Sequence, residues 1–440
     1  MGTVAALIEK AGVPVVTEEY DLPDLLAVAK FNGLLNGCPN YRQVAVTPDT
    51  FILDYSPWVP EFIDGLTIPL TEEEATAGTY APPAPPRICM TGNYDEMMEY
   101  FEGDQVAHYS GGPWAWMNDG SPIVPPTEER VAKMLTGTSH SPDEVLEFKQ
   151  YGTRLGTIEK IAVNAVMAGC KPEYMPAVLA IAESGACVGY SGDSSFGNLY
   201  VVSGPYAKEI GMNCGFDFWC TGNPANTSLE KACQLMGANL GGCQHGINML
   251  ERTGNKHWGS IFAEHTDTPW ETLNVHYGYE PTESVLLPFK IKVEVIPFQN
   301  YEVVNARDLE ECQAGTPAHA VGAFESNTNM SSGILILAPD TAHLWQRKYP
   351  EAATMDSLEQ FFVENVLEST DIKYDNYWWL KRNAPPEDWV PGTAGFEPSF
   401  ASTDDITIIV AGGTGDAWSF GFGSPCRRGT CAIYSIDKWR

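Results

Sequence analysis

A cysteine between two predicted helices is the clearest candidate for a reactive side chain. Cys170 follows a helical pattern that ends at Gly169, and Pro172 begins the next helix. The thiol therefore stands at a helix N-terminus, beside Lys171. The helix dipole and the neighbouring cation favour a thiolate and would lower the pKa of Cys170 into a reactive range. We expect a nucleophile or redox thiol; the alternative is a small buried side chain between two helices.

Imidazoles and carboxylates gather in a second segment, residues 245–276, which holds half of the eight histidines. If the fold brings these side chains together, they suit general acid–base chemistry or metal ligation. Glu264 and His265 are the catalytic candidates here, and a metal would be held by His257, Glu264 and His265. The spacing matches no metal template, so hydrogen-bonded structural histidines are the alternative.

Glycines follow an apolar strand near the end of the sequence. They leave backbone amides accessible, and free amides at the end of a parallel strand can hold an anion. We therefore expect Gly412, Gly413 and Gly415 to contact a substrate. The full dinucleotide-binding fingerprint is missing, and a tight turn without a ligand is the alternative.

Alternating helical and extended patterns must position these residues, and they predict an α/β fold of several domains in which helices flank mixed or parallel sheets. No repeat of fixed period is present. The patterns predict strands at 13–16, 43–46, 199–202, 286–297, 333–338 and 406–411. They predict helices at 4–10, 24–35, 127–135, 228–236 and 357–366.

Shifts in composition predict the domain boundaries. The acidic, proline-rich stretch 71–87 cannot continue a helix or a sheet and is expected to be a linker. Turn-forming residues before Thr127, an expected N-cap, mark a second break. We expect a partial small α/β domain with its linker at 1–85, an irregular connection at 86–126, a central α/β domain at 127–300 and a C-terminal α/β domain at 301–440.

Charge and cysteine content narrow the partners and the location. The 57 acidic and 26 basic side chains give a net charge of −31, which repels nucleic acids and anionic membranes. No apolar run is long enough to span a bilayer, and the first residues lack the pattern of a signal peptide. Eleven cysteines without a repeated close spacing suggest reduced thiols. These features predict a cytoplasmic protein that binds neither nucleic acid nor membrane.

Several blocks, read in order, resemble the UGSC-type bacterial proteins, which are named for a selenocysteine- or cysteine-Gly-Ser-Cys motif. The resembling blocks are 119–130, 159–174, Ser203-Gly204-Pro205 with Asn213, Ala225-Asn226, Phe262-Ala263-Glu264 ahead of Pro269-Trp270-Glu271, and Gly412-Gly413. The resemblance covers most of the chain. It implies a shared α/β fold and a site at a domain interface to which Asn164, Asn213 and Asn226 contribute, with the two asparagines at 213 and 226 binding substrate.

The chain departs from this family at two places. In the family the thiol or selenol motif lies just before a helix and strand that resemble residues 7–16, and this sequence begins at that helix. Relatives also tend to carry a histidine after Gly189, where this chain has Ser191-Gly192-Asp193-Ser194-Ser195. A sheet without an inner strand leaves unpaired backbone groups, so we expect a separate short subunit to supply the strand and the motif in a hetero-oligomer.

Together these observations favour a subunit of a cytoplasmic enzyme that acts on a small molecule by thiol- or selenol-assisted redox or bond-cleaving chemistry. In this hypothesis the partner supplies the reactive group and Glu264 handles protons. A non-catalytic scaffold or binding subunit is the first alternative. A metal-dependent hydrolase or lyase is the second. The sequence indicates no particular cofactor.

Overall fold

The computed structural model confirms the α/β fold. It describes two four-stranded mixed sheets, three two-stranded sheets and the helices around them. The described residues are 11–21, 41–47, 54–72, 87–108, 121–148, 154–185, 196–220, 222–241, 258–292, 296–298, 316–325, 332–370, 395–414, 419–424 and 432–440, with isolated positions 5, 8, 9, 26, 74, 374, 388, 390, 392 and 393.

The first four-stranded sheet has the order β14-β7-β5-β6. Strand β5 runs parallel to β6 and antiparallel to β7, which is antiparallel to β14. Its strands are β5 (Phe196–Ser203), β6 (Trp258–Ala263), β7 (Val285–Lys292) and β14 (Tyr434–Ser435). Apolar helices cover its outer face: α6 (Glu128–Leu135), α7 (Ile158–Met167), α8 (Met175–Ser184) and α10 (Pro224–Asn239).

The second four-stranded sheet has the order β12-β9-β13-β8. Its strands are β8 (Ile296–Phe298), β9 (Ser332–Leu337), β12 (Ile406–Val410) and β13 (Ser419–Ser424). Its outer face packs on α12 (Pro317–Glu325), α13 (Pro339–Lys348) and α14 (Met355–Asn365). Phe324, Trp345 and Phe362 from these helices are buried against Leu335 and Ile408.

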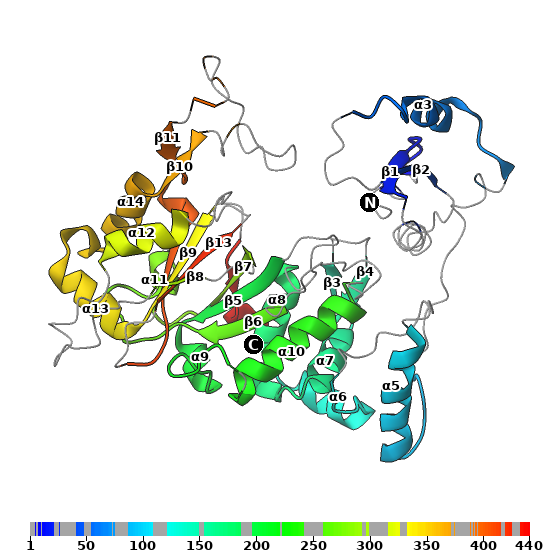
Figure 1. Cartoon of the computed structure of the whole chain (residues 1–440). Helices are drawn as coiled ribbons and strands as arrows, with labels where there is room; N and C mark the ends of the chain where they lie inside the picture. Colours follow the sequence, from blue (N-terminus) through cyan, green and yellow to red (C-terminus); the bar gives the residue numbers. More distant parts are fainter. Residues whose placement is uncertain are drawn as a thin grey trace.

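The two sheets pack face to face, because their central strands are apolar on both sides. Successive strand residues point to opposite faces. Leu199 and Val201 of β5 therefore pack with Ile334 and Ile336 of β9 between the sheets, whereas Tyr200 points towards the helices. The result is four layers, helix, sheet, sheet and helix, which Figure 1 shows from the yellow helices on one side to the green helices on the other.

Both sheets have the same sequence of strand directions. Strand β9 is parallel to β12 and antiparallel to β13, which is antiparallel to β8. The edge strands are exchanged between the halves: β8 directly follows β7 in sequence but pairs in the second sheet, and β14 returns to β7 in the first. The single strand predicted at 286–297 is therefore wrong. It is two strands in different sheets, which apolar composition alone does not distinguish.

The other predicted elements mostly have their expected counterparts. Helices α6, α10 and α14 and strands β2, β5, β9 and β12 confirm the patterns from which they were expected. The first strand begins at Val16 rather than at residue 13, and only parts of the helices expected at 4–10 and 24–35 lie within the described residues. Thr127 is the N-cap of α6 and accepts a hydrogen bond from the Arg130 N–H, as predicted.

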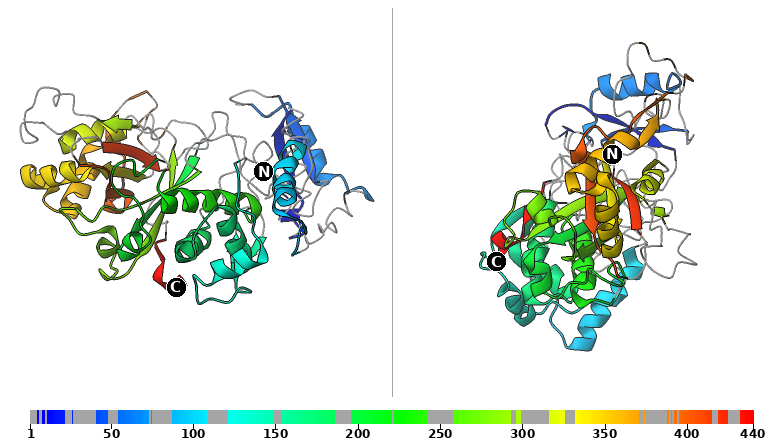
Figure 2. Two further views of the ribbon diagram at one scale, coloured as in Figure 1. Left: turned by 90° about the horizontal axis from the view of Figure 1, so that it is seen from below. Right: turned by 90° about the vertical axis from the view of Figure 1, so that its left-hand side faces the viewer.

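Smaller elements surround the two main sheets (Figure 2). Strands β1 (Val16–Tyr20) and β2 (Arg42–Val46) pair in parallel, and α3 (Val59–Thr67) packs against them. The remaining elements are α5 (Tyr94–His108), β3 (Val145–Phe148), β4 (Arg154–Thr157), α9 (Pro205–Glu209), α11 (Leu273–His276), β10 (Leu367–Ser369) and β11 (Phe396–Pro398). None of the helices in the described ranges has the length and apolarity needed to span a membrane.

Candidate functional site

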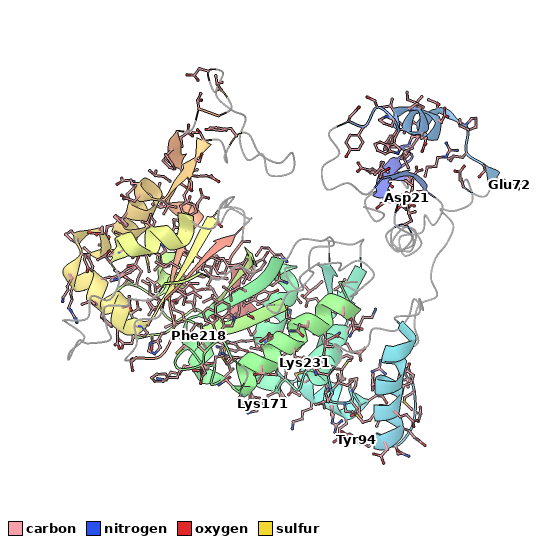
Figure 3. All side chains as sticks on the ribbon, in the orientation of Figure 1. Asp21, Glu72, Tyr94, Lys171, Phe218 and Lys231 are labelled. Atoms are coloured by element: carbon pink, nitrogen blue, oxygen red, sulfur yellow. The ribbon has the colours of Figure 1, made fainter. Side chains whose placement is uncertain are left out.

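The carboxyl ends of β6 and β12 meet where the two sheets face each other. Backbone hydrogen bonds join these ends: the His265 N–H donates to the Val410 carbonyl at 2.7 Å, and the Gly412 N–H donates to the Cys214 carbonyl at 2.8 Å. Phe218, labelled in Figure 3 near the middle of the molecule, packs beside this junction against the ring of Phe262. Glu264, His265 and Gly412, three residues singled out from the sequence, are thus brought to one edge.

Glu264 is the buried acid of this edge, with an exposed fraction of 6%. The Ser203 hydroxyl donates to its Oε2 at 2.5 Å, and the Leu273 N–H lies 3.0 and 2.9 Å from its two oxygens. Burial raises the pKa of Glu264 to about 7, and these hydrogen bonds together with His276 oppose the rise. The carboxyl group is therefore fixed in position and balanced between its two protonation states near neutral pH.

Asn274 completes the network around Glu264, and the sequence analysis did not find it. Its N–H donates to the Ser203 Oγ at 2.9 Å, and its side-chain Nδ2 donates to the carbonyls of Glu280 and Glu283. Thr272 Oγ1 donates to Asn274 Oδ1 at 2.7 Å. The only sequence signal was Thr272, a residue type that often precedes a helix, and it did not indicate a polar network.

His265 uses its ring to shape the turn after β6. Its Nδ1 accepts a hydrogen bond from the Asp267 N–H at 3.0 Å, so the ring proton of the neutral imidazole is on Nε2. His257 lies outside the described residues, so the expected metal triad of His257, Glu264 and His265 is not assembled within them. Among the described side chains, the group that could hold a metal ion is instead His276, Asp356 and Glu359.

Asn213 and Asn226, expected to bind substrate, are brought together but hold a loop. Asn226 is buried; its Oδ1 accepts from the Asn213 N–H at 3.0 Å, and its Nδ2 donates to the carbonyls of Asn213 and Phe218. Asn213 accepts from the Gly215 N–H and donates to the Phe216 carbonyl. Both amide groups thus fix the loop 213–218 beside the junction, and in this arrangement they serve the backbone.

The glycines after β12 allow this loop to approach closely. Gly412 has a positive φ of 126°, and a Cβ on Gly413 would lie 2.2 Å from the ring of Phe216. The Phe216 side chain is 71% exposed, so its ring covers the Gly413 backbone at the surface. Gly415 lies outside the described residues. The close approach of a protein ring explains the glycine at 413 without a ligand.

Asn164 and Cys170 lie in the outer helical layer rather than at the junction. Asn164 Nδ2 donates to the Lys160 carbonyl, and Asn164 Oδ1 accepts from Asn239 Nδ2 at 2.7 Å, which ties α7 to α10. The Cys170 thiol is buried and donates to the Ser228 carbonyl at 3.4 Å. Burial raises the pKa of Cys170 to about 12. The lowered pKa expected from the helix N-terminus is therefore wrong, and the buried-cysteine alternative is correct.

No model of a protein family, no curated protein and no solved structure matches the chain. The resemblance to UGSC-type proteins therefore stays an expectation from the sequence blocks. What the chain does must be argued from the arrangement of its own residues.

Proposed function

We propose that the chain is part of a small-molecule enzyme in which Glu264 transfers protons at the carboxyl ends of the parallel strands. One observation carries the proposal: a buried carboxyl group is fixed by Ser203 and Leu273 at the strand ends where the two sheets meet. Ligands of α/β proteins commonly bind at this end of parallel strands. The five cysteines in the described part of the chain form no disulfide, which agrees with the cytoplasmic location that the sequence predicts.

The surroundings of Glu264 suit a general acid–base. A pKa of about 7 leaves both the acid and the carboxylate populated at neutral pH, so the group can take a proton from a substrate and return it. Ser203 and the Leu273 amide orient the carboxyl group, and Asn274 orients Ser203. The positioned acid thus supports proton-transfer chemistry such as the bond-cleaving reactions expected from the sequence.

Untargeted mass spectrometry of small molecules tests this proposal. A metabolite extract is incubated with the full chain and with the Glu264→Gln variant. The matched control is Glu230→Gln, which removes an acid of α10 whose pKa is also raised to about 7 by burial. We expect the wild-type protein and the control to consume the same compound and Glu264→Gln to lose at least tenfold in rate. An extract that the wild-type protein leaves unchanged contradicts the proposal and favours a scaffold.

We also propose that a short partner chain joins the N-terminal sheet, as the hetero-oligomer hypothesis requires. Within the described residues this sheet has only β1 and β2, so its edges are open to a further strand. One face of α3 is apolar and faces solvent: Val59, Ile63 and Leu66 lie at helical spacing and are 44%, 54% and 52% exposed. A strand with an apolar face, such as the one expected to carry the reactive motif, would fit beside them.

Native purification followed by intact mass spectrometry tests the partner. We expect a stoichiometric short chain that carries a cysteine- or selenocysteine-Gly-Ser-Cys motif. Ile63→Glu places a charge in the apolar face and should abolish its co-purification, whereas Glu61→Gln on the same helix should retain it. A single chain in the native complex would contradict the partner but leave the role of Glu264 open to its own test.

A further inference from the structure

A histidine and two acids from distant parts of the sequence converge between α11 and α14. His276 ends α11, and Asp356 and Glu359 lie three positions apart on one side of α14. The possible ligand atoms of these three side chains all lie within 4.8 Å of one another. Spatial proximity of this kind is the first requirement for a shared ion, although it is not sufficient by itself.

Glu359 supplies an independent observation. Its side chain is 4% exposed, and its Oε1 is buried without a hydrogen-bond partner. The nearest opposite charge is the His276 Nε2 at 3.4 Å, which does not form a hydrogen bond with it. A buried carboxylate oxygen without a partner is costly, and a bound cation is one of the few groups that offset the cost.

The ring of His276 is oriented as a metal ligand would be. Its Nδ1 lies 3.0 Å from Oε1 of Glu271, so the ring proton sits on Nδ1 and the lone pair of Nε2 is directed towards Glu359. Metal-bound histidines usually donate their second nitrogen to a carboxylate in this way. Glu271 would thus fix both the tautomer and the direction of the ring.

The charge around the cluster is unbalanced. Three carboxylates, those of Glu271, Asp356 and Glu359, surround one imidazole. No lysine or arginine in the described ranges forms an ion pair with any of them. Asp356 is exposed whereas Glu359 is buried, so an ion could enter from the Asp356 side and keep water on its open positions.

We propose that His276, Asp356 and Glu359 bind a divalent transition-metal ion, with Glu271 as a positioning residue. One imidazole nitrogen with carboxylate oxygens favours Zn²⁺ or Mn²⁺ over Ca²⁺ or Mg²⁺, which prefer oxygen ligands alone. The inference does not depend on the role of Glu264. It uses neither His257 nor His265, the histidines from which the sequence suggested a metal site.

Binding of Mn²⁺ to the chelator-treated full chain tests the proposal. Electron paramagnetic resonance of free Mn²⁺ counts bound ions, and the cysteines contribute little because thiolates select softer metals. We expect one Mn²⁺ per chain. Glu359→Gln and Asp356→Asn should each weaken binding at least tenfold, and Glu271→Gln should weaken it about 10–100-fold. Glu364→Gln, on the same helix but hydrogen-bonded to Gln360, is the matched control and should bind normally.

Thermal unfolding separates loss of the ion from loss of the fold. Zn²⁺ should raise the Tm of the wild-type protein and of Glu364→Gln but not that of Glu359→Gln. Without metal, Glu359→Gln should melt no lower than the wild type, because it removes a buried charge that lacks a hydrogen bond. A wild-type protein without stoichiometric Mn²⁺ or Zn²⁺ overturns the proposal. So does a metal-free Glu359→Gln that melts lower while binding the ion normally, since His276 and Glu359 would then be a simple ion pair.

Discussion

Glu264 shows how one side chain can serve both the fold and a reaction. Its carboxyl group accepts the Leu273 N–H at the start of α11 and the Ser203 hydroxyl at the end of β5. These bonds favour the ionised form, but burial opposes it more strongly and raises the pKa to about 7. The cost of burying the charge is therefore linked to pH.

The stability of the protein should depend on pH through this residue. A carboxyl pKa raised from 4.5 to about 7 on folding means that the folded state binds a proton more tightly than the unfolded state. Its contribution to stability is full below pH 4.5 and is lost as the pH rises through 7, which amounts to about 3 kcal/mol. Glu264→Gln should lack this loss.

Urea unfolding at pH 5, 6, 7 and 8 measures the effect. The difference in unfolding free energy between Glu264→Gln and the wild type should grow in favour of the variant up to pH 7 and then level off. Parallel pH curves for the two proteins would mean that Glu264 is ionised normally in the folded state.

At the residue scale, the sequence predicted positions better than roles. Glu264, His265 and Gly412 do lie at one edge, because strand ends could be recognised from apolar runs that stop at polar or glycine residues. The environment of Cys170 could not be recognised, since the burial that raises its pKa comes from α8 and α10, which approach it only in the folded chain. The cluster of His276 with α14 was missed because about 80 residues separate its parts.

The short helix α11 is the element that links the two proposed sites. Its first residue is bound by Glu264, and its last is His276, which faces Glu359. The loop that follows α11 packs against the end of β5, where Gly204 has a positive φ of 108°. Backbone geometry at this point therefore controls how the strand end, the helix and Glu264 fit together.

Gly204→Ala should disturb this fit. A Cβ at this position would lie 2.4 Å from the Glu283 carbonyl oxygen and 2.8 Å from the Ser284 Cα, neither of which can move without the backbone. Clash and backbone strain together should lower the free energy of unfolding by about 3 kcal/mol. Gly211→Ala is the matched control: its φ is also positive, at 71°, but the space around it is open, so about 1 kcal/mol is expected. Equal losses in urea unfolding would contradict the close contact.

At the element scale, apolar periodicity predicted most of the buried strands and amphipathic helices. It failed where one apolar run serves two sheets, as at 286–297, and where a strand is glycine-rich, as β13 is between Ser419 and Ser424. Partner choice between strands depends on the whole sheet and is not recorded in either strand alone.

The whole molecule depends on the last described residues. Trp439 is buried and donates from Nε1 to Glu183 Oε2 at 3.0 Å, Asp437 accepts the Ser284 N–H, and His140 stacks on the Trp439 ring. These contacts hold residues 434–440 on the first sheet and α8. The predicted boundary at residue 300 gave no indication that the chain returns to this half.

Trp439→Ala should be strongly destabilising. Removing a buried indole leaves a cavity and an unpartnered Glu183 oxygen, for a loss of about 3–5 kcal/mol in the free energy of unfolding. Trp439→Phe keeps most of the packing and should lose about 1–2 kcal/mol. Chemical denaturation of the three proteins measures both, and an unchanged midpoint for the alanine variant would show that the segment is not part of the cooperative unit.

The exchange of edge strands also sets the order in which the protein can be completed during synthesis. Strand β7 ends at Lys292, and its neighbour β14 begins only at Tyr434. While the ribosome makes the second sheet, the first must wait with β7 as an exposed edge, and pairings so distant in sequence form slowly. The nascent chain is consequently most vulnerable to aggregation through β7, and chaperone demand should peak after residue 292 and fall once β14 has left the exit tunnel.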